Sequence, residues 1–357
     1  MIKKECFTAE WIEQVSSELH YNDKNLIEKV IRALSLLEML VKAGCPLVFK
    51  GGTALMLILG KSAHRLSIDI DLICPPGTNI EDYLKSFADF GFINLELVER
   101  KQRDDADIPK SHSKFFYQIA YRNDTDAQSY ILLDVLYEDI HYFRTQQIAI
   151  NCPFIRLEGK PLMVTVPSAE DILGDKLTAF APNTTGIPYY KNGRSCSMEI
   201  AKQLYDVGRL FENVSDLQIT KEAFRKIAVV ELSYRSFGTD IGQVFNDIRQ
   251  TALCISTRGK AGEGDFDLIQ DGIIRVKSFM YKLRYLIDHA IIDAARAAYL
   301  ATLIEKGINE IESYSNNPAD IKDMVIRPSL PNKLNKLRSN LPEAYYYWAK
   351  TSELLEA

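Results

Sequence analysis

Apolar and polar residues alternate along several short segments in the first half of the chain, a pattern typical of strands with one buried face. The segments that show this alternation, or form apolar runs of strand length, are 46–50, 67–74, 92–99, 114–122, 130–137 and 161–166. An amphipathic helix over 26–40 precedes the first of them, because its apolar residues recur at helical spacing. This order predicts an α/β domain with a mixed sheet.

The pattern changes at the Pro167-Ser168 junction, after which apolar residues recur mostly at helical spacing. One predicted helical stretch is long and amphipathic, from Val276 to Leu303. A chain of 357 residues is also longer than a single core usually serves. We therefore expect an N-terminal α/β domain over 1–166 and a mainly helical domain over 167–357.

Two glycines follow the first predicted strand directly. The strand ends near Lys50, Gly51-Gly52 form a turn without side chains, and a helix begins at Thr53. A backbone without Cβ atoms can approach an anion closely, and the N–H groups at a helix start favour negative charge. A Gly-Gly pair alone is usually only a turn, but here it predicts phosphate binding by Lys50, Gly51, Gly52 and Thr53.

Two aspartates alternate with apolar residues in the next predicted strand. Asp69 and Asp71 flank Ile70, so we expect both carboxylates on one side of the strand. Two anions in a shielded site need a cation between them, and Mg²⁺ is often held by one or two carboxylates together with substrate phosphates. The motif predicts Asp69 and Asp71 as ligands of Mg²⁺ or Mn²⁺, with a solvated strand edge as the alternative.

A third carboxylate, Asp134, interrupts the long apolar run over 130–137. A charged residue inside such a strand is costly unless it is paired or bound to a metal. Asp134 is therefore a candidate third metal ligand. The alternative is an acid at a sheet edge or one paired with a lysine.

The segments Lys50–Leu55 and Arg65–Leu72 together resemble the AbiEii/AbiGii toxins, which are related to the MenT toxins and to the polymerase β-type nucleotidyltransferase superfamily. The resemblance implies a magnesium-dependent nucleotidyltransferase with a third carboxylate, for which Asp134 fits. We expect Arg65 and Ser67 to support the acidic strand or to contact phosphate. A toxin of this kind implies a cognate antitoxin encoded nearby.

The same resemblance assigns roles to two residues of the helical part. Lys176 lies beside an apolar stripe of a helix that Ser168 caps, and Asp206 lies near the buried face of a second helix in a Leu-Tyr-Asp context. The resemblance implies that Lys176 binds the triphosphate and that Asp206 acts as a base or orienting carboxylate. The alternative is an ordinary Lys–Asp ion pair between helices.

The segment between these two helices, 181–194, contains prolines and glycines that preclude a continuous helix. Lys191, Arg194 and the tyrosines at 189 and 190 are candidates for contact with an acceptor strand or a base. A plain solvated loop is the alternative interpretation.

Composition restricts the remaining classes of function. The net charge of −5 argues against broad, nonspecific nucleic-acid binding, although it allows a local basic patch. The cysteines are scattered without a zinc or disulfide pattern. Neither a signal peptide nor an apolar run of membrane-spanning length is apparent, so we expect a cytoplasmic protein without a membrane partner.

The sequence thus predicts a toxin that transfers NMP from an NTP to an acceptor and thereby inhibits translation and growth. By resemblance, the acceptor is a tRNA 3′ end. A protein hydroxyl or a small molecule are alternative acceptors. A further alternative is an NTP-binding toxin that sequesters a partner without any transfer.

Overall fold

The computed structural model describes residues 1–98, 110–121, 127–214, 216–234, 238 and 240–357. The chain divides into two compact units. Unit 1 comprises Met1–Ser168 and Ser278–Leu283, and unit 2 comprises Ala169–Lys277 and Arg284–Ala357. The expected ends of two strands, Glu99 and Arg122, lie outside the described residues. The predicted fold class, a mixed-sheet α/β part followed by a mainly helical part, is confirmed.

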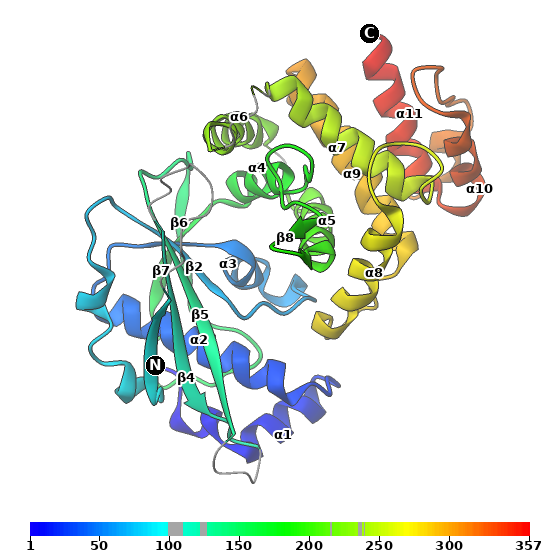
Figure 1. Ribbon diagram of the computed structural model, residues 1–357. Helices are drawn as coiled ribbons and strands as arrows, with labels where there is room; N and C mark the ends of the chain where they lie inside the picture. Colours follow the sequence, from blue (N-terminus) through cyan, green and yellow to red (C-terminus); the bar gives the residue numbers. More distant parts are fainter. Residues whose placement is uncertain (99–109, 122–126, 215, 235–237, 239) are drawn as a thin grey trace. The chain divides into compact units, whose positions relative to one another are not determined.

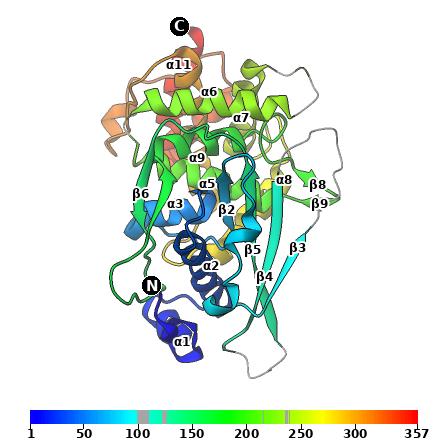
Figure 2. The ribbon, with the colours of Figure 1, turned by 90° about the vertical axis from the view of Figure 1, so that its left-hand side faces the viewer.

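Unit 1 is built around a five-stranded mixed sheet with the order β1-β2-β5-β4-β3. Its strands are β1 (Val48–Lys50), β2 (Ile70–Cys74), β3 (Asn94–Val98), β4 (Lys110–Gln118) and β5 (Gln128–Tyr137). β2 and β5 are parallel, whereas the other neighbouring pairs are antiparallel. The long strands β4 and β5 lie side by side in Figure 1 and Figure 2.

One face of this sheet forms the core of unit 1. The helices of the unit are α1 (Ala9–Glu18), α2 (Lys24–Lys42) and α3 (Gly51–Leu59), and α2 packs against β2 and β5. Along β5, Ile131, Leu133 and Val135 are buried, whereas Leu132 and Asp134 between them are only half-buried. This alternation places Asp134 on the less buried face of the sheet.

The predicted strand over 161–166 is present as β7 (Met163–Pro167), but it does not join the five-stranded sheet. It pairs antiparallel with β6 (Thr145–Ala149) in a separate two-stranded sheet. The sequence pattern does not predict β6, because Gln146 and Gln147 interrupt the apolar alternation.

The predicted helix over 276–303 is wrong in its first part. α8 (Phe266–Val276) ends there, and α9 begins only at Ile287. The intervening segment Ser278–Leu283 belongs to unit 1, where the Leu66 N–H donates to the Phe279 carbonyl at 2.8 Å and Arg65 forms a β-bridge with Met280. Pairing between residues so distant in the sequence leaves no sign in the local hydrophobic periodicity.

Unit 2 is mainly helical. Besides α8 it contains α4 (Ala169–Ala179), α5 (Ser197–Phe211), α6 (Leu217–Ser233), α7 (Ile241–Ser256), α9 (Ile287–Lys306), α10 (Leu337–Asn340), α11 (Pro342–Glu356) and a hairpin of β8 (Tyr190–Lys191) and β9 (Arg194–Ser195). α9 packs against α5, α7 and α11, and its buried alanines allow the close approach of these helices. Among the described helices, none combines the length and the apolarity needed to cross a membrane.

Candidate active site

The glycine turn and the aspartate strand meet in unit 1. Gly51 has a φ of +82°, in the left-handed region, and begins α3 directly after β1. A Cβ atom at Gly51 would lie 2.1 Å from Oδ2 of Asp71. The carboxylate of Asp71 therefore touches the turn that is predicted to bind phosphate, and only glycine fits at position 51.

The second glycine lies against two further predicted residues. A Cβ atom at Gly52 would lie 2.6 Å from Oγ of Ser67 and 3.0 Å from Nη2 of Arg65. Arg65 is buried, and its Nη1 donates to the Leu66 carbonyl at 3.0 Å. Arg65 and Ser67 thus line the start of α3, in positions consistent with phosphate contact or with support of the aspartate segment.

The first N–H groups of α3 receive no side-chain cap from Lys50, the residue that precedes the helix. Such groups favour a bound anion. Thr53 is fully buried, and its hydroxyl donates to the carbonyl of Asp69 at 2.7 Å. The phosphate contact predicted for Thr53 therefore concerns its backbone N–H, while its side chain ties the helix start to Asp69.

Asp69 and Asp71 do not both lie within the strand. β2 begins at Ile70, so Asp69 comes immediately before it and Asp71 is its second residue. The expected strand over 67–74 is therefore too long at its start, because the preceding Leu66 is held by the segment Ser278–Leu283 instead of by a strand of the sheet. Asp69 and Asp71 are both half-buried.

Polar residues of four neighbouring strands form one row across the sheet. Lys50 of β1 is the register partner of Asp71, Asp71 that of Asp134, and Asp134 that of His112 on β4. Register partners project to the same face of a sheet. The structure therefore brings Lys50, Asp71 and Asp134 to one face and adds His112 to them.

His112 is a residue to which the sequence analysis assigns no role. Its Nδ1 forms a short hydrogen bond with Oδ1 of Asp134. The predicted strand over 114–122 begins too late to include His112, whereas β4 begins at Lys110. The alternation of Lys110, His112 and Lys114 is the signal that could have placed the histidine on the face of Asp134.

The donor set of this face suits a hard cation. In the part of the chain that the structure describes, no three His, Cys, Asp or Glu side chains converge into a group that could hold a metal ion by themselves. Mg²⁺ is commonly bound by one or two carboxylates and completed by substrate phosphates and water. Asp69, Asp71 and Asp134 are the predicted carboxylate donors for such a shared site, and their metal contacts remain a prediction.

Lys176 and Asp206 form an ion pair within unit 2. Nζ of Lys176 on α4 lies 3.1 Å from Oδ2 of Asp206 on α5, and the side chains are only 9% and 2% exposed. Leu177, Leu204 and Val207 are fully buried beside them. The ion pair that the sequence allowed is thus present, and the expectation that unit 2 completes the active site remains a prediction.

The segment between α4 and α5 is not helical, as predicted. Its first part is anchored by Asp247, which accepts hydrogen bonds of 2.8 Å from Asn183 and Thr184. Its second part is the hairpin β8–β9 (Figure 2), in which Lys191 and Arg194 are register partners and both are exposed. The hairpin therefore presents two cations directly opposite each other.

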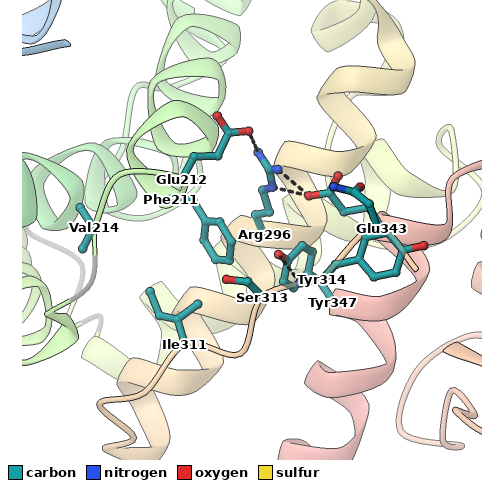
Figure 3. A pocket seen from close by; sticks show the side chains of 10 residues that line it. Phe211, Glu212, Val214, Arg296, Ile311, Ser313, Tyr314, Glu343 and Tyr347 are labelled. Carbon is teal, nitrogen blue, oxygen red and sulfur yellow. Dashed lines mark hydrogen bonds and ion pairs between the residues drawn. The ribbon is translucent and has the colours of Figure 1, made fainter. Parts of the chain in front are cut away.

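Unit 2 also contains a cavity of about 560 Å³ that the sequence analysis does not predict. Figure 3 shows Arg296 between Glu212 and Glu343 on its wall. The cavity is lined by Phe211, Glu212, Val214, Arg296, Ile311, Ser313, Tyr314, Asn316, Glu343 and Tyr347. Arg296 is ion-paired to both glutamates, so this cation of the wall already has its counter-charges within the protein.

Residues 34–280 match the family model described as "Nucleotidyl transferase AbiEii toxin, Type IV TA system", a segment that contains every predicted site residue. No curated protein matches the chain. MenT4, a nucleotidyltransferase toxin from Mycobacterium tuberculosis H37Rv, is 14% identical with a TM-score of 0.41, covering 82% of this chain and 89% of its own. JHP933 from Helicobacter pylori is 16% identical with a TM-score of 0.39, covering 86% and 95%.

Proposed function

Because this chain belongs to the AbiEii family of type IV nucleotidyltransferase toxins, we propose that it transfers NMP from an NTP to the 3′ end of a tRNA. The family implies a nucleotide substrate and an antitoxin partner. In the proposed reaction, the 3′-hydroxyl oxygen bonds to the α-phosphorus and its proton passes to solvent water. The bond from this phosphorus to the bridging oxygen breaks, and pyrophosphate leaves. A nucleotide added to a tRNA 3′ end blocks aminoacylation, which inhibits translation and growth.

The contact between Gly51 and Asp71 carries this proposal. It places an uncapped helix start, suited to phosphate oxygens, directly beside a carboxylate suited to a cation. A nucleoside triphosphate with its divalent ion has these two features adjacent to each other. A Gly-Gly pair that only formed a turn would not require a carboxylate at the Cβ position of its first glycine.

In this proposal, different groups around the contact between Gly51 and Asp71 bind the phosphates and the metal ion. The backbone N–H groups of Gly51, Gly52 and Thr53 bind terminal phosphate oxygens, and Lys50, Arg65 and Ser67 add charge and hydrogen bonds. Asp69, Asp71 and Asp134 hold Mg²⁺ or Mn²⁺. The bound ion supplies Lewis acidity at the phosphate and lowers the pKa of the attacking hydroxyl.

The proposal assigns a role in triphosphate binding to Lys176 of unit 2. Lys176 supplies a buried ammonium group for the phosphates, and Asp206, at 3.1 Å, fixes its orientation. A lysine in an apolar surrounding carries a charge that is weakly screened, which strengthens its attraction to phosphate. Asp206 is in this account an orienting carboxylate.

The test is incubation of the full chain with each α-labelled NTP, Mg²⁺ and total tRNA, beside the isosteric variant Asp71→Asn. We expect label on tRNA that disappears with the variant and with EDTA, and returns when Mg²⁺ or Mn²⁺ is added in excess. Label on a protein or a small molecule would overturn the tRNA assignment. Nucleotide binding without any transfer would support the sequestering alternative.

A second experiment addresses toxicity. Expression of the wild-type chain in a bacterial host should arrest growth, whereas Asp71→Asn expressed at the same level should not. Co-expression of the antitoxin gene adjacent to this one should restore growth. Arrest by the Asp71→Asn variant would show that growth inhibition does not depend on the transfer reaction.

A further inference from the structure

The hydrogen bond between His112 and Asp134 has no role in the proposal so far. The two residues are register partners on β4 and β5, and Asp134 is in turn the partner of Asp71 on β2. The histidine therefore stands next to the predicted metal ligand that is farthest from the glycine turn in the row. Nothing in the motif that the family resemblance rests on includes a histidine at this position.

The exposed fractions of the His112 and Asp134 side chains indicate that His112 positions Asp134. The His112 side chain is 12% exposed, whereas that of Asp134 is 37% exposed. In a pair that served only to neutralise a buried acid, the carboxylate would be the more buried member. Here the imidazole is the more buried partner, and the carboxylate keeps access to solvent.

The chemistry of the contact fixes its direction. An ionised carboxylate can only accept a hydrogen bond, so Nδ1 of His112 carries the proton and donates it to Oδ1 of Asp134. Among the described residues, no other donor contacts the Asp134 side chain. Oδ2 is thus left for reacting groups, and His112 alone restricts the rotation of the carboxylate.

We propose that His112 is a positioning residue that orients Asp134 for the transfer reaction. The inference rests on the proposed function, in which Asp134 contributes an oxygen atom to the cation. Without the hydrogen bond the carboxylate rotates freely and loses the geometry needed in the transition state. The triphosphate is held at the start of α3, so its binding does not require His112.

Two matched variants test the proposal. In His112→Asn the side-chain amide places an N–H donor near the position of Nδ1, whereas His112→Leu keeps volume but removes the donor. We expect kcat for label transfer to fall about 10–100-fold in His112→Leu, the usual cost of losing a group that orients a metal ligand. We expect His112→Asn to stay within a few-fold of wild type, and KM for the NTP to change little in either variant.

Two controls separate positioning from general destabilisation. In an Asp134→Ala background, His112→Leu should cause no additional loss of kcat. By ¹H–¹⁵N NMR of the full chain, the Nδ1 proton of His112 should be observed and should shift upfield in Asp134→Ala. This spectrum reports the contact without any requirement for turnover.

Different outcomes would contradict the positioning role of His112 and the proposed transferase activity. Unchanged kcat in His112→Leu, equal losses in both His112 variants, or an unprotonated Nδ1 would overturn the positioning role while leaving the transferase intact. A wild-type chain that transfers no nucleotide to any acceptor would overturn the proposed function, and the positioning role with it.

Discussion

The carboxylate of Asp71 fills the space in which a side chain at Gly51 would have to stand, with Oδ2 2.1 Å from the position of the missing Cβ atom. This relationship joins the first residue of α3 to a strand residue that follows the end of that helix in the sequence. It also makes the glycine sensitive to substitution for two separate reasons, its positive φ and its close neighbour.

We expect Gly51→Ala to abolish transfer and to destabilise unit 1. The left-handed backbone costs about 1–2 kcal/mol with a side chain, and the new methyl group displaces Asp71. The control is Gly44→Ala, because Gly44 has a φ of +75° but nothing within 4 Å of its Cβ position. Denaturant unfolding should show the backbone cost in both variants and a larger loss of stability in Gly51→Ala, and label transfer should be lost in Gly51→Ala alone.

Variants of the ion pair between Lys176 and Asp206 can distinguish a role in protein stability from a role in NTP binding. Removing one partner, as in Asp206→Leu, leaves a buried charge unpaired and should cost about 3–5 kcal/mol of unfolding free energy. The double variant Lys176→Met/Asp206→Leu should recover most of that stability. If Lys176 binds phosphate, the double variant will still have a raised KM for the NTP. Recovery of both stability and KM would reduce the pair to a structural role.

The hairpin β8–β9 is expected to contact the acceptor nucleic acid. Two cations directly opposite each other are unfavourable on a hairpin unless an anion lies between them, and Tyr190 beside them is 57% exposed. Lys191→Glu/Arg194→Glu should raise KM for tRNA at least tenfold and leave KM for the NTP unchanged. The exposed pair Lys306→Glu/Lys336→Glu makes the same change in net charge and serves as the control. Equal effects of the two double variants would refute a specific contact.

Stability should depend on pH through Glu38. Burial raises the pKa of this carboxyl; its Oε2 accepts from the Ile2 N–H at 2.9 Å, and its Oε1 has no hydrogen-bond partner among the described residues. A pKa raised on folding means that the native state holds the proton more tightly, so unfolding free energy falls as pH rises through the folded-state pKa. Glu38→Gln removes this dependence.

The measurement is a series of denaturant unfolding curves for wild type and Glu38→Gln from pH 4 to pH 8. The stability advantage of the variant should grow with pH and then level off above the folded-state pKa. A constant difference across the series would mean that folding does not change the pKa of Glu38.

The sequence predicted the parts of the site that depend on local pattern. The glycine turn, the start of α3 and the acidic strand each follow from a few consecutive residues, and in the structure Gly51 lies against Asp71 and Gly52 against Ser67. The boundaries of β2 and β4 could not be predicted equally well, because strand ends are decided by which distant segment pairs with them. For that reason Asp69 falls outside β2, and His112 was not associated with Asp134.

The same limit explains the error over 276–303. The amphipathic pattern corresponds to helices before and after the error, α8 up to Val276 and α9 from Ile287. Between them the chain leaves unit 2 at Ser278 and returns to it at Arg284. The β-bridge between Arg65 and Met280 and the hydrogen bond from the Leu66 N–H to the Phe279 carbonyl show why. A local pattern cannot reveal a partner more than two hundred residues earlier.

The return of Ser278–Leu283 to the first unit means that the polypeptide passes between the two units at three points along its length. A fragment ending at Ser168 therefore lacks the segment that pairs with Arg65 and Leu66, and with it part of the support beneath Gly52. After cleavage between Ser168 and Ala169, residues 1–168 are held to the rest of the chain only by the non-covalent packing of Ser278–Leu283 in unit 1. Neither unit can therefore be exchanged as one continuous segment of the sequence, either in evolution or by protein engineering.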